Sequence, residues 1–225
     1  MERHFDEELK NLNKEILQMG ALTEEAIYKS IEALKKRDKE LAQGVIDNDT
    51  DIDNLELAID EKCVDLIARY QPMAGDLRFI ATGMKINSEL ERIADIAVDI
   101  AQRTLELLDK PLLKPLVDIP KLTTIAQNMV KMAIDAFVNG DIELARKVLL
   151  SDPEADKLRN LIQKELIEDY MVKDASTAPR AVQLLLIARF LERICDHTTN
   201  IAEDVIYMVQ AKVVKHHPEK LKHAS

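Results

Sequence analysis

Apolar residues recur every three or four positions along most of the chain, with charged residues between them. This spacing places apolar side chains on one face of an α-helix and polar side chains on the other. The pattern predicts six long helices and no strand, over residues 5–36, 39–70, 76–109, 120–138, 141–173 and 178–213.

The boundaries between these stretches carry helix start and stop signals. Asp38 and Asp141 are expected to cap the helices that follow them, and Asn139-Gly140 to end the helix before Asp141. Pro72 and Gly75 are expected to break the chain in QPMAGDLR. The stretch KPLLKPLVDIP, which begins at Lys110, contains three prolines and therefore cannot be a single helix.

The two halves of the chain are similar to each other. At an offset of 103 residues Asp38, Asp49 and Asp53 match Asp141, Asp152 and Asp156, and at an offset of 101 Glu91 matches Glu192. Three amphipathic helices can enclose one core, so each half predicts an up-down-up bundle. The predicted fold is all-α, with two tandem, pseudo-symmetric three-helix bundles. The predicted divisions are a first repeat at 1–109, a proline-rich linker at 110–119, a second repeat at 120–213 and a charged tail at 214–225.

Composition narrows the class of protein. Five glycines, 4% aromatic residues and no tryptophan favour helices, and the net charge of −10 argues against nucleic-acid binding. No apolar stretch reaches the roughly 20 residues of a membrane span, and the amino terminus lacks the apolar core of a signal peptide, so a cytoplasmic location is expected. Cys63 and Cys195 have no metal-type spacing and are interpreted as small apolar residues.

Carboxylates are stacked along one face of the third helix in each half. Glu91, Asp95 and Asp99 follow one another at intervals of four residues, and Glu192 with Asp196 repeats the pattern. Like charges at this spacing destabilise a helix by a few tenths of a kcal/mol per pair unless a positive charge offsets them. That positive charge is either a neighbouring arginine, such as Arg92, or a metal ion.

The second helix of each half adds carboxylates at the same spacing. Because the second and third helices of a three-helix bundle are neighbours, the two acidic faces are expected to converge. Carboxylate oxygens are hard ligands that suit magnesium, manganese or iron. An amide oxygen and one further carboxylate continue the face in the second half. The candidate metal ligands are Asp49, Asp53, Glu91, Asp95, Asp99, Asp152, Asp156, Glu192, Asp196, Asn200 and Glu203.

Other interpretations compete at several of these positions. A charged helix face is most often simply solvated. Asp152 precedes Pro153, and the favoured interpretation is a helix N-cap at Asp152, with Asp49 restarting its helix at a kink. His197 matches Ile96 of the first half and is interpreted as a packing or surface residue. His216 and His217 lie in the charged tail and are not expected to form a site.

Four further motifs stand out along the chain: Met19-Gly20, PMAGDLR at 72–78, LERIADIAVDIA at 90–101 and LERICDHTTNIA at 191–202. Together with the internal repeat, they resemble the motifs of the PhoU family, regulators of bacterial phosphate uptake. The resemblance implies two three-helix bundles whose carboxylate motifs hold multinuclear metal clusters, with iron expected first and zinc, manganese or magnesium as alternatives. DASTAPRAVQ in the second half lacks the DLR triplet, so the two sites are expected to differ in nuclearity or affinity.

The resemblance also implies a function without catalysis. PhoU-like proteins restrain the phosphate ABC transporter from its cytoplasmic ATPase side, and keep the phosphate-regulon sensor histidine kinase from activating its response regulator. A homodimer is expected, without membrane insertion. Two alternatives remain: an acidic helical adaptor that needs no metal, and a di-metal carboxylate enzyme. The enzyme is disfavoured because no histidine has a glutamate three residues before it.

Overall fold

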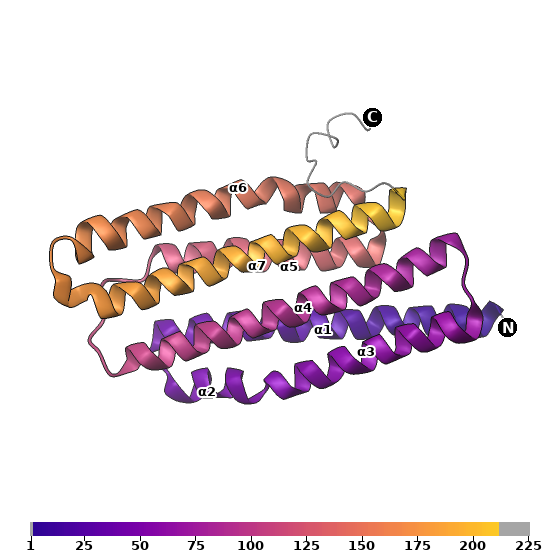
Figure 1. Cartoon of the computed structure of the whole chain (residues 1–225), viewed down its shortest axis with the longest axis horizontal. Coiled ribbons are helices and arrows are strands. Elements are labelled where there is room, and N and C mark those ends of the chain that lie inside the picture. Colours follow the sequence, from indigo (N-terminus) through magenta and orange to yellow (C-terminus); the bar gives the residue numbers. More distant parts are fainter. Residues whose placement is uncertain (1, 212–225) are drawn as a thin grey trace.

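The computed structural model describes residues 2–211, which are helical along most of their length and contain no strand (Figure 1). The described residues do not include the last two residues of the helix predicted to 213, or the predicted tail at 214–225 with His216 and His217. The elements are α1 (Glu2–Lys36), α2 (Lys39–Asp47), α3 (Asp49–Tyr70), α4 (Ala74–Leu108), α5 (Asp118–Asn139), α6 (Ile142–Glu165), the π-helix η1 (Leu166–Met171), the 3₁₀-helix η2 (Ala175–Thr177) and α7 (Ala178–Gln210).

The helix starts predicted after Asp38 and Asp141 and the helix end predicted at Gly140 are confirmed. The backbone N–H of Leu41 donates to Asp38 Oδ1 over 3.0 Å, and that of Leu144 donates to Asp141 Oδ1 over the same distance. Gly140 ends α5 with a φ of 60°, in the left-handed region where glycine avoids strain. These caps fix the start of the second helix in each repeat.

Two expectations about the second helices need correction. In the first repeat this helix is broken at Asn48 into α2 and α3, at the kink expected beside Asp49. In the second repeat α6 passes through Pro153 without a break, so the interpretation of Asp152 as an N-cap is wrong. Val148, Ala155 and Ile162 are buried at intervals of seven residues on both sides of Pro153. This continuous packing holds α6 helical although the proline lacks a backbone N–H.

The predicted pair of three-helix bundles is confirmed. The helices α1, α2 with α3, and α4 form the first bundle, and α5, α6 and α7 form the second (Figure 1). The bundles lie side by side, with α4 against α7 and α1 against α5. Residues 109–117 connect them without a helix. Most buried apolar residues of both bundles belong to one continuous core, and a small separate cluster in the first bundle comprises Ala33, Ala42, Val45 and Ala101.

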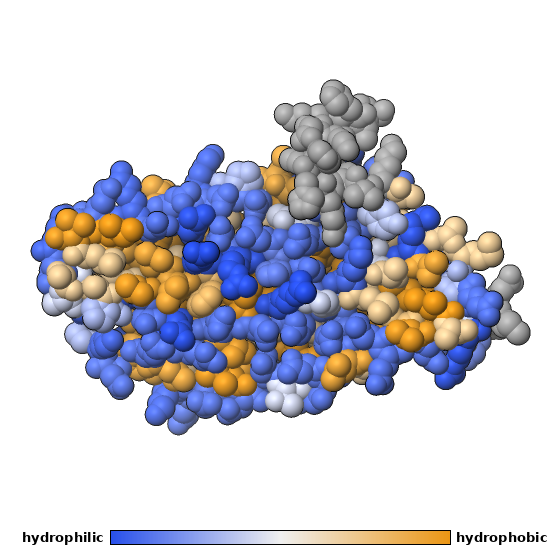
Figure 2. All heavy atoms as spheres, viewed as in Figure 1, coloured by the Kyte–Doolittle hydropathy of each residue, from blue (hydrophilic) through white to orange (hydrophobic). Residues whose placement is uncertain are grey.

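The contact between the repeats is apolar in its interior and close at one crossing. Phe79 of α4 and Phe137 of α5 stack with their ring centroids 5.2 Å apart. Where α1 passes α5, a Cβ added to Gly20 would lie 2.4 Å from Ile134 Cδ1, well inside van der Waals contact. The absence of a side chain at Gly20 therefore allows the bundles to approach each other at this crossing. Figure 2 shows the outer face, where hydrophilic side chains gather along the middle and hydrophobic ones toward both ends.

We expect Gly20→Val to destabilise the protein by about 1–3 kcal/mol, because the added methyl groups overlap Ile134 at the contact between repeats. The free energy of unfolding, measured by urea denaturation, tests this. Gly44→Val is the matched control, since a Cβ at Gly44 of α2 meets nothing within 4 Å. Equal changes in both variants would show that Gly20 has no packing role, because helix propensity alone favours valine over glycine at both positions.

Candidate metal centre

The structure brings the predicted carboxylates of the first repeat together between α3 and α4. Partial burial raises the pKa of Asp49, and the charges of Asp53 and Asp95 raise it further. The pKa of Asp95 is raised in the same way, by partial burial and then by Asp53 and Asp99. Glu91 behaves alike, with burial, Asp95, Glu56 and Asp53 all raising its pKa. These side chains thus share one region of negative charge.

Glu56 belongs to this group, although the sequence analysis did not include it. Partial burial and the charges of Asp60 and Asp53 raise its pKa. Glu56 lies seven residues after Asp49, two helical turns along the same face of α3, and that spacing was a usable signal. The first cluster therefore comprises Asp49, Asp53, Glu56, Glu91, Asp95 and Asp99.

The second cluster lies at the equivalent place between α6 and α7 and comprises Asp152, Asp156, Glu192 and Asp196. Burial, followed by the charges of Asp196, Asp156 and Glu192, raises the pKa of Asp152 to about 6. The pKa of Asp196 is also raised, by burial and by the charges of Glu192 and Asp156. The predicted convergence of the acidic faces is therefore present in both repeats.

An arginine distinguishes the second cluster from the first. Arg159 Nη2 lies 3.0 Å from Glu192 Oε1 and 3.7 Å from Asp156 Oδ1. At the offset of 103 residues, Arg159 matches Glu56. One repeat therefore places a guanidinium where the other places a carboxylate, and the second cluster carries its own counter-charge.

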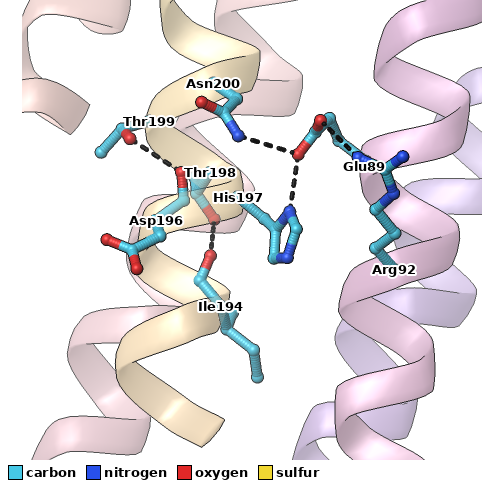
Figure 3. Close-up of polar contacts among 8 residues, drawn as sticks. All are labelled: Glu89, Arg92, Ile194, Asp196, His197, Thr198, Thr199 and Asn200. Atoms are coloured by element: carbon cyan, nitrogen blue, oxygen red, sulfur yellow. Dashed lines mark hydrogen bonds and ion pairs between the residues drawn. The ribbon is translucent and has the colours of Figure 1, made fainter. Parts of the chain in front are cut away.

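Asn200, a predicted ligand of the second half, is directed toward the first repeat. Its side-chain amide donates to Glu89 Oε2 of α4 over 3.2 Å. Figure 3 shows Asn200 and His197 extending toward Glu89, while the carboxylate of Asp196 points away from them. Glu203, another predicted ligand, lies on α7 seven residues beyond Asp196 and is half-buried.

Glu89 instead forms a polar junction between the repeats (Figure 3). His197 Nδ1 lies 2.7 Å from Glu89 Oε2, and Arg92 Nη1 lies 3.4 Å from Glu89 Oε1. Burial alone would raise the pKa of Glu89, but the hydrogen bonds to His197 and Asn200 outweigh it and lower that pKa. His197, which was interpreted as a packing or surface residue, is half-buried and in contact with α4.

The donor chemistry of the clusters fits a hard cation. Every side chain of the first cluster offers carboxylate oxygens, and Asp49 Oδ1 is buried without a hydrogen-bond donor. Burial first, and mutual repulsion second, raise the pKa of Asp49, Glu56, Glu91 and Asp95, and a bound cation would offset both effects. Within residues 2–211, no group of three or more His, Cys, Asp or Glu side chains is arranged so that it could hold a metal ion. Binding would therefore require carboxylates to turn toward the ion.

The cysteines agree with the sequence interpretation. Cys63 and Cys195 are free and buried. Burial raises the pKa of the Cys63 thiol to about 12 and also raises that of Cys195. A nucleophilic thiolate is therefore disfavoured at both positions. Among residues 2–211, no helix is both long enough and apolar enough to cross a bilayer.

Fold and site together define a class: tandem three-helix-bundle proteins with a carboxylate cluster between the second and third helices of each repeat. The PhoU domain matches this chain twice, over residues 16–104 and 119–205. These matches cover most of the chain, and the protein belongs to the PhoU family.

Named relatives and solved structures agree with this assignment. A phosphate-specific transport system accessory protein PhoU homolog of Aquifex aeolicus is 41% identical over 93% of this chain and 94% of its own length. The PhoU protein of Escherichia coli is 34% identical over 94% of this chain and 88% of its own length. The crystal structure of PhoU from Pseudomonas aeruginosa has a TM-score of 0.88 and 37% identity, covering 92% of this chain and all of that one.

Two glutamates of α4 are expected to respond oppositely to loss of charge. Glu89→Gln should destabilise the protein by about 1–3 kcal/mol at neutral pH, because the ionised carboxylate accepts two hydrogen bonds from α7. Glu91→Gln should stabilise it by up to about 1 kcal/mol, because it relieves repulsion within the first cluster. Urea denaturation of metal-free protein measures both.

The free energy of unfolding at acidic pH tests the same interpretation of Glu89. Since the pKa of Glu89 is lowered in the folded state, its contribution is present above the usual carboxyl pKa and is lost as the pH falls through the folded value. The difference between wild type and Glu89→Gln should therefore shrink below about pH 4. Destabilisation by both glutamine variants at neutral pH would contradict the contrast between the two sites.

Asp152 should make the metal-free protein less stable as the pH rises. Its folded pKa of about 6 exceeds the usual value of 3.8, so its contribution is full below the usual value and is lost as the pH rises through 6. Asp152→Asn should flatten this dependence and stabilise the protein by about 1–2 kcal/mol at pH 7.5, after allowance for solvent screening. Glu154→Gln, an exposed change on the same helix, should leave the pH profile unchanged.

Proposed function

We propose that this protein is an accessory regulator of the phosphate transport system and acts in the cytoplasm. In this role it restrains phosphate uptake and the phosphate-starvation response when phosphate is plentiful. It does so by docking on the cytoplasmic side of the phosphate ABC transporter and on the regulon's sensor histidine kinase. The observation that carries the proposal is that both halves match the PhoU domain, together with relatives that are named as accessory proteins of that transport system.

We further propose that the two carboxylate clusters bind metal, with iron expected first and zinc, manganese or magnesium as alternatives. In the first cluster the oxygens of Asp49, Asp53, Glu91 and Asp95 would hold the ion, with Glu56 and Asp99 beside them. The buried, unpaired Asp49 Oδ1 supports this. A bound cation would supply the positive charge that these carboxylates lack.

The second cluster is expected to hold metal more weakly. Arg159 already pairs with Glu192 and lies near Asp156, so a cation entering there must compete with a guanidinium. This difference arises within the carboxylate clusters themselves, in addition to the difference that the missing DLR triplet predicts.

A homodimer stays a prediction, which light scattering coupled to size-exclusion chromatography tests directly.

Metal content is the first test of these sites. We expect tag-free wild-type protein, incubated with each candidate metal and desalted, to retain metal by elemental mass spectrometry. Asp53→Asn with Asp95→Asn should lower the retained amount, and Arg159→Gln should raise it by freeing the second cluster. Asp51→Asn with Glu61→Gln removes two exposed carboxylates from α3 and should change nothing. Equal loss in both double variants would mean that the metal is held by surface charge alone.

Binding to membranes that contain the phosphate ABC transporter separates regulation from metal binding. We expect wild type to bind these membranes, and binding to require a loaded first cluster. If wild type binds equally without metal while Glu91→Ala with Asp95→Ala abolishes binding, the protein is a metal-independent acidic adaptor. If no condition gives binding, the docking proposal is wrong whatever the metal content.

A further inference from the structure

A groove runs along the outer face of the second repeat between α6 and α7. Its volume is about 460 Å³, and three arginines and a glutamine line it with two members of the second cluster. The polar lining residues are Arg159, Gln163, Arg189, Arg193, Glu192 and Asp196. The groove therefore carries more cationic than anionic side chains on a protein whose net charge is −10.

The first repeat has a different set of residues at the matching positions. At the offsets of 103 and 101 residues, the counterparts of the six are Glu56, Asp60, Ser88, Arg92, Glu91 and Asp95. That lining has one arginine against four carboxylates, whereas the groove in the second repeat has three arginines against two. The excess of positive charge is therefore a feature of the second repeat and does not follow from the shared fold.

The space itself also differs between the repeats. In the first repeat the buried Asn87 donates to Glu56 O over 2.8 Å and to Asp60 Oδ1 over 3.1 Å, which ties α4 to α3. The matching residue of the second repeat is Ala188, whose short side chain lines the groove. The asparagine bridge is thus replaced by open space beside the arginines.

Arg159 is prepared to meet an acceptor. Its Nη2 pairs with Glu192 over 3.0 Å, which neutralises one of the two carboxylates in the lining, and its Nη1 donates to Asn160 over 2.8 Å. Its Nε is buried and has no hydrogen-bond partner. A buried donor without an acceptor is unfavourable, so Arg159, which lines the groove, still has one unmet hydrogen-bonding group.

We propose that this groove binds the phosphate group of a small-molecule ligand through Arg159, Arg189 and Arg193. Guanidinium groups match the geometry of phosphate oxygens. Three guanidinium groups suit a phosphate group, which has two charges and at least three acceptor oxygens, better than they suit a carboxylate, which has one charge and two acceptor oxygens. Gln163 adds an amide donor to the lining of the groove. The proposal depends on neither metal binding nor docking to the transporter.

Calorimetric titration of the metal-free, full-length protein tests the proposal. One titration uses inorganic phosphate and a second uses adenosine monophosphate, which distinguishes the free anion from a phosphomonoester. We expect saturable binding of at least one of them at low ionic strength. Arg193→Gln should weaken binding about tenfold or more. Arg189→Ser, which introduces the residue found at the matching position 88 of the first repeat, should do the same.

Arg92→Gln is the matched control, because Arg92 occupies the position of Arg193 in the first repeat, where the lining is acidic. It removes the same charge and should leave the affinity unchanged. Arg189 and Arg193 are exposed, so their variants are expected to fold, and circular dichroism confirms this. Failure of both ligands to bind, an equal loss in Arg92→Gln and Arg193→Gln, or equally tight binding of acetate would overturn the assignment.

Discussion

The apolar contact between the two repeats is the interaction on which the rest of the structure depends. Stacking of Phe79 on Phe137 and the close approach at Gly20 join the bundles into one continuous core. Burial on this scale favours a single relative position of the bundles because core side chains interlock at high density. That position brings α4 beside α7 and so determines which polar side chains face one another.

Polar groups that meet across this contact have partners of opposite charge or hydrogen-bonding character, whereas the clustered carboxylates within a repeat repel one another. Across it, Glu89 meets His197 and Asn200, and Lys85 lies 3.2 Å from the buried Asp204. Burial is therefore accompanied by a partner, as low-dielectric surroundings require. Within the first repeat, by contrast, carboxylates from two helices are held together, and in the second repeat Arg159 offsets only part of the negative charge. Repulsion between the carboxylates lowers stability and marks both surfaces as candidate binding sites.

The two repeats share the arrangement of three helices, and they differ in chemistry between the second and third helices. Arg159 stands where the first repeat has Glu56, and Ala188 stands where it has Asn87. These exchanges alter both the charge and the space between the second and third helices. One repeat therefore presents a more acidic surface between its second and third helices, and the other presents a groove with an excess of arginine.

The sequence was sufficient to predict six helical segments in two bundles. Helix periodicity and capping residues act over a few residues, and the internal repeat showed that the two halves have similar folds. The same spacing also predicted that Asp49 with Asp53, and Glu91 with Asp95, would each share a helix face, and the adjacency of the two helices predicted that these faces would converge. Tertiary packing decided the rest. It kept α6 helical through Pro153, turned Asn200 toward Glu89, and placed Arg159 beside Glu192. These outcomes depend on contacts between helices far apart in sequence, and a local pattern carries no information about which neighbour a side chain will meet.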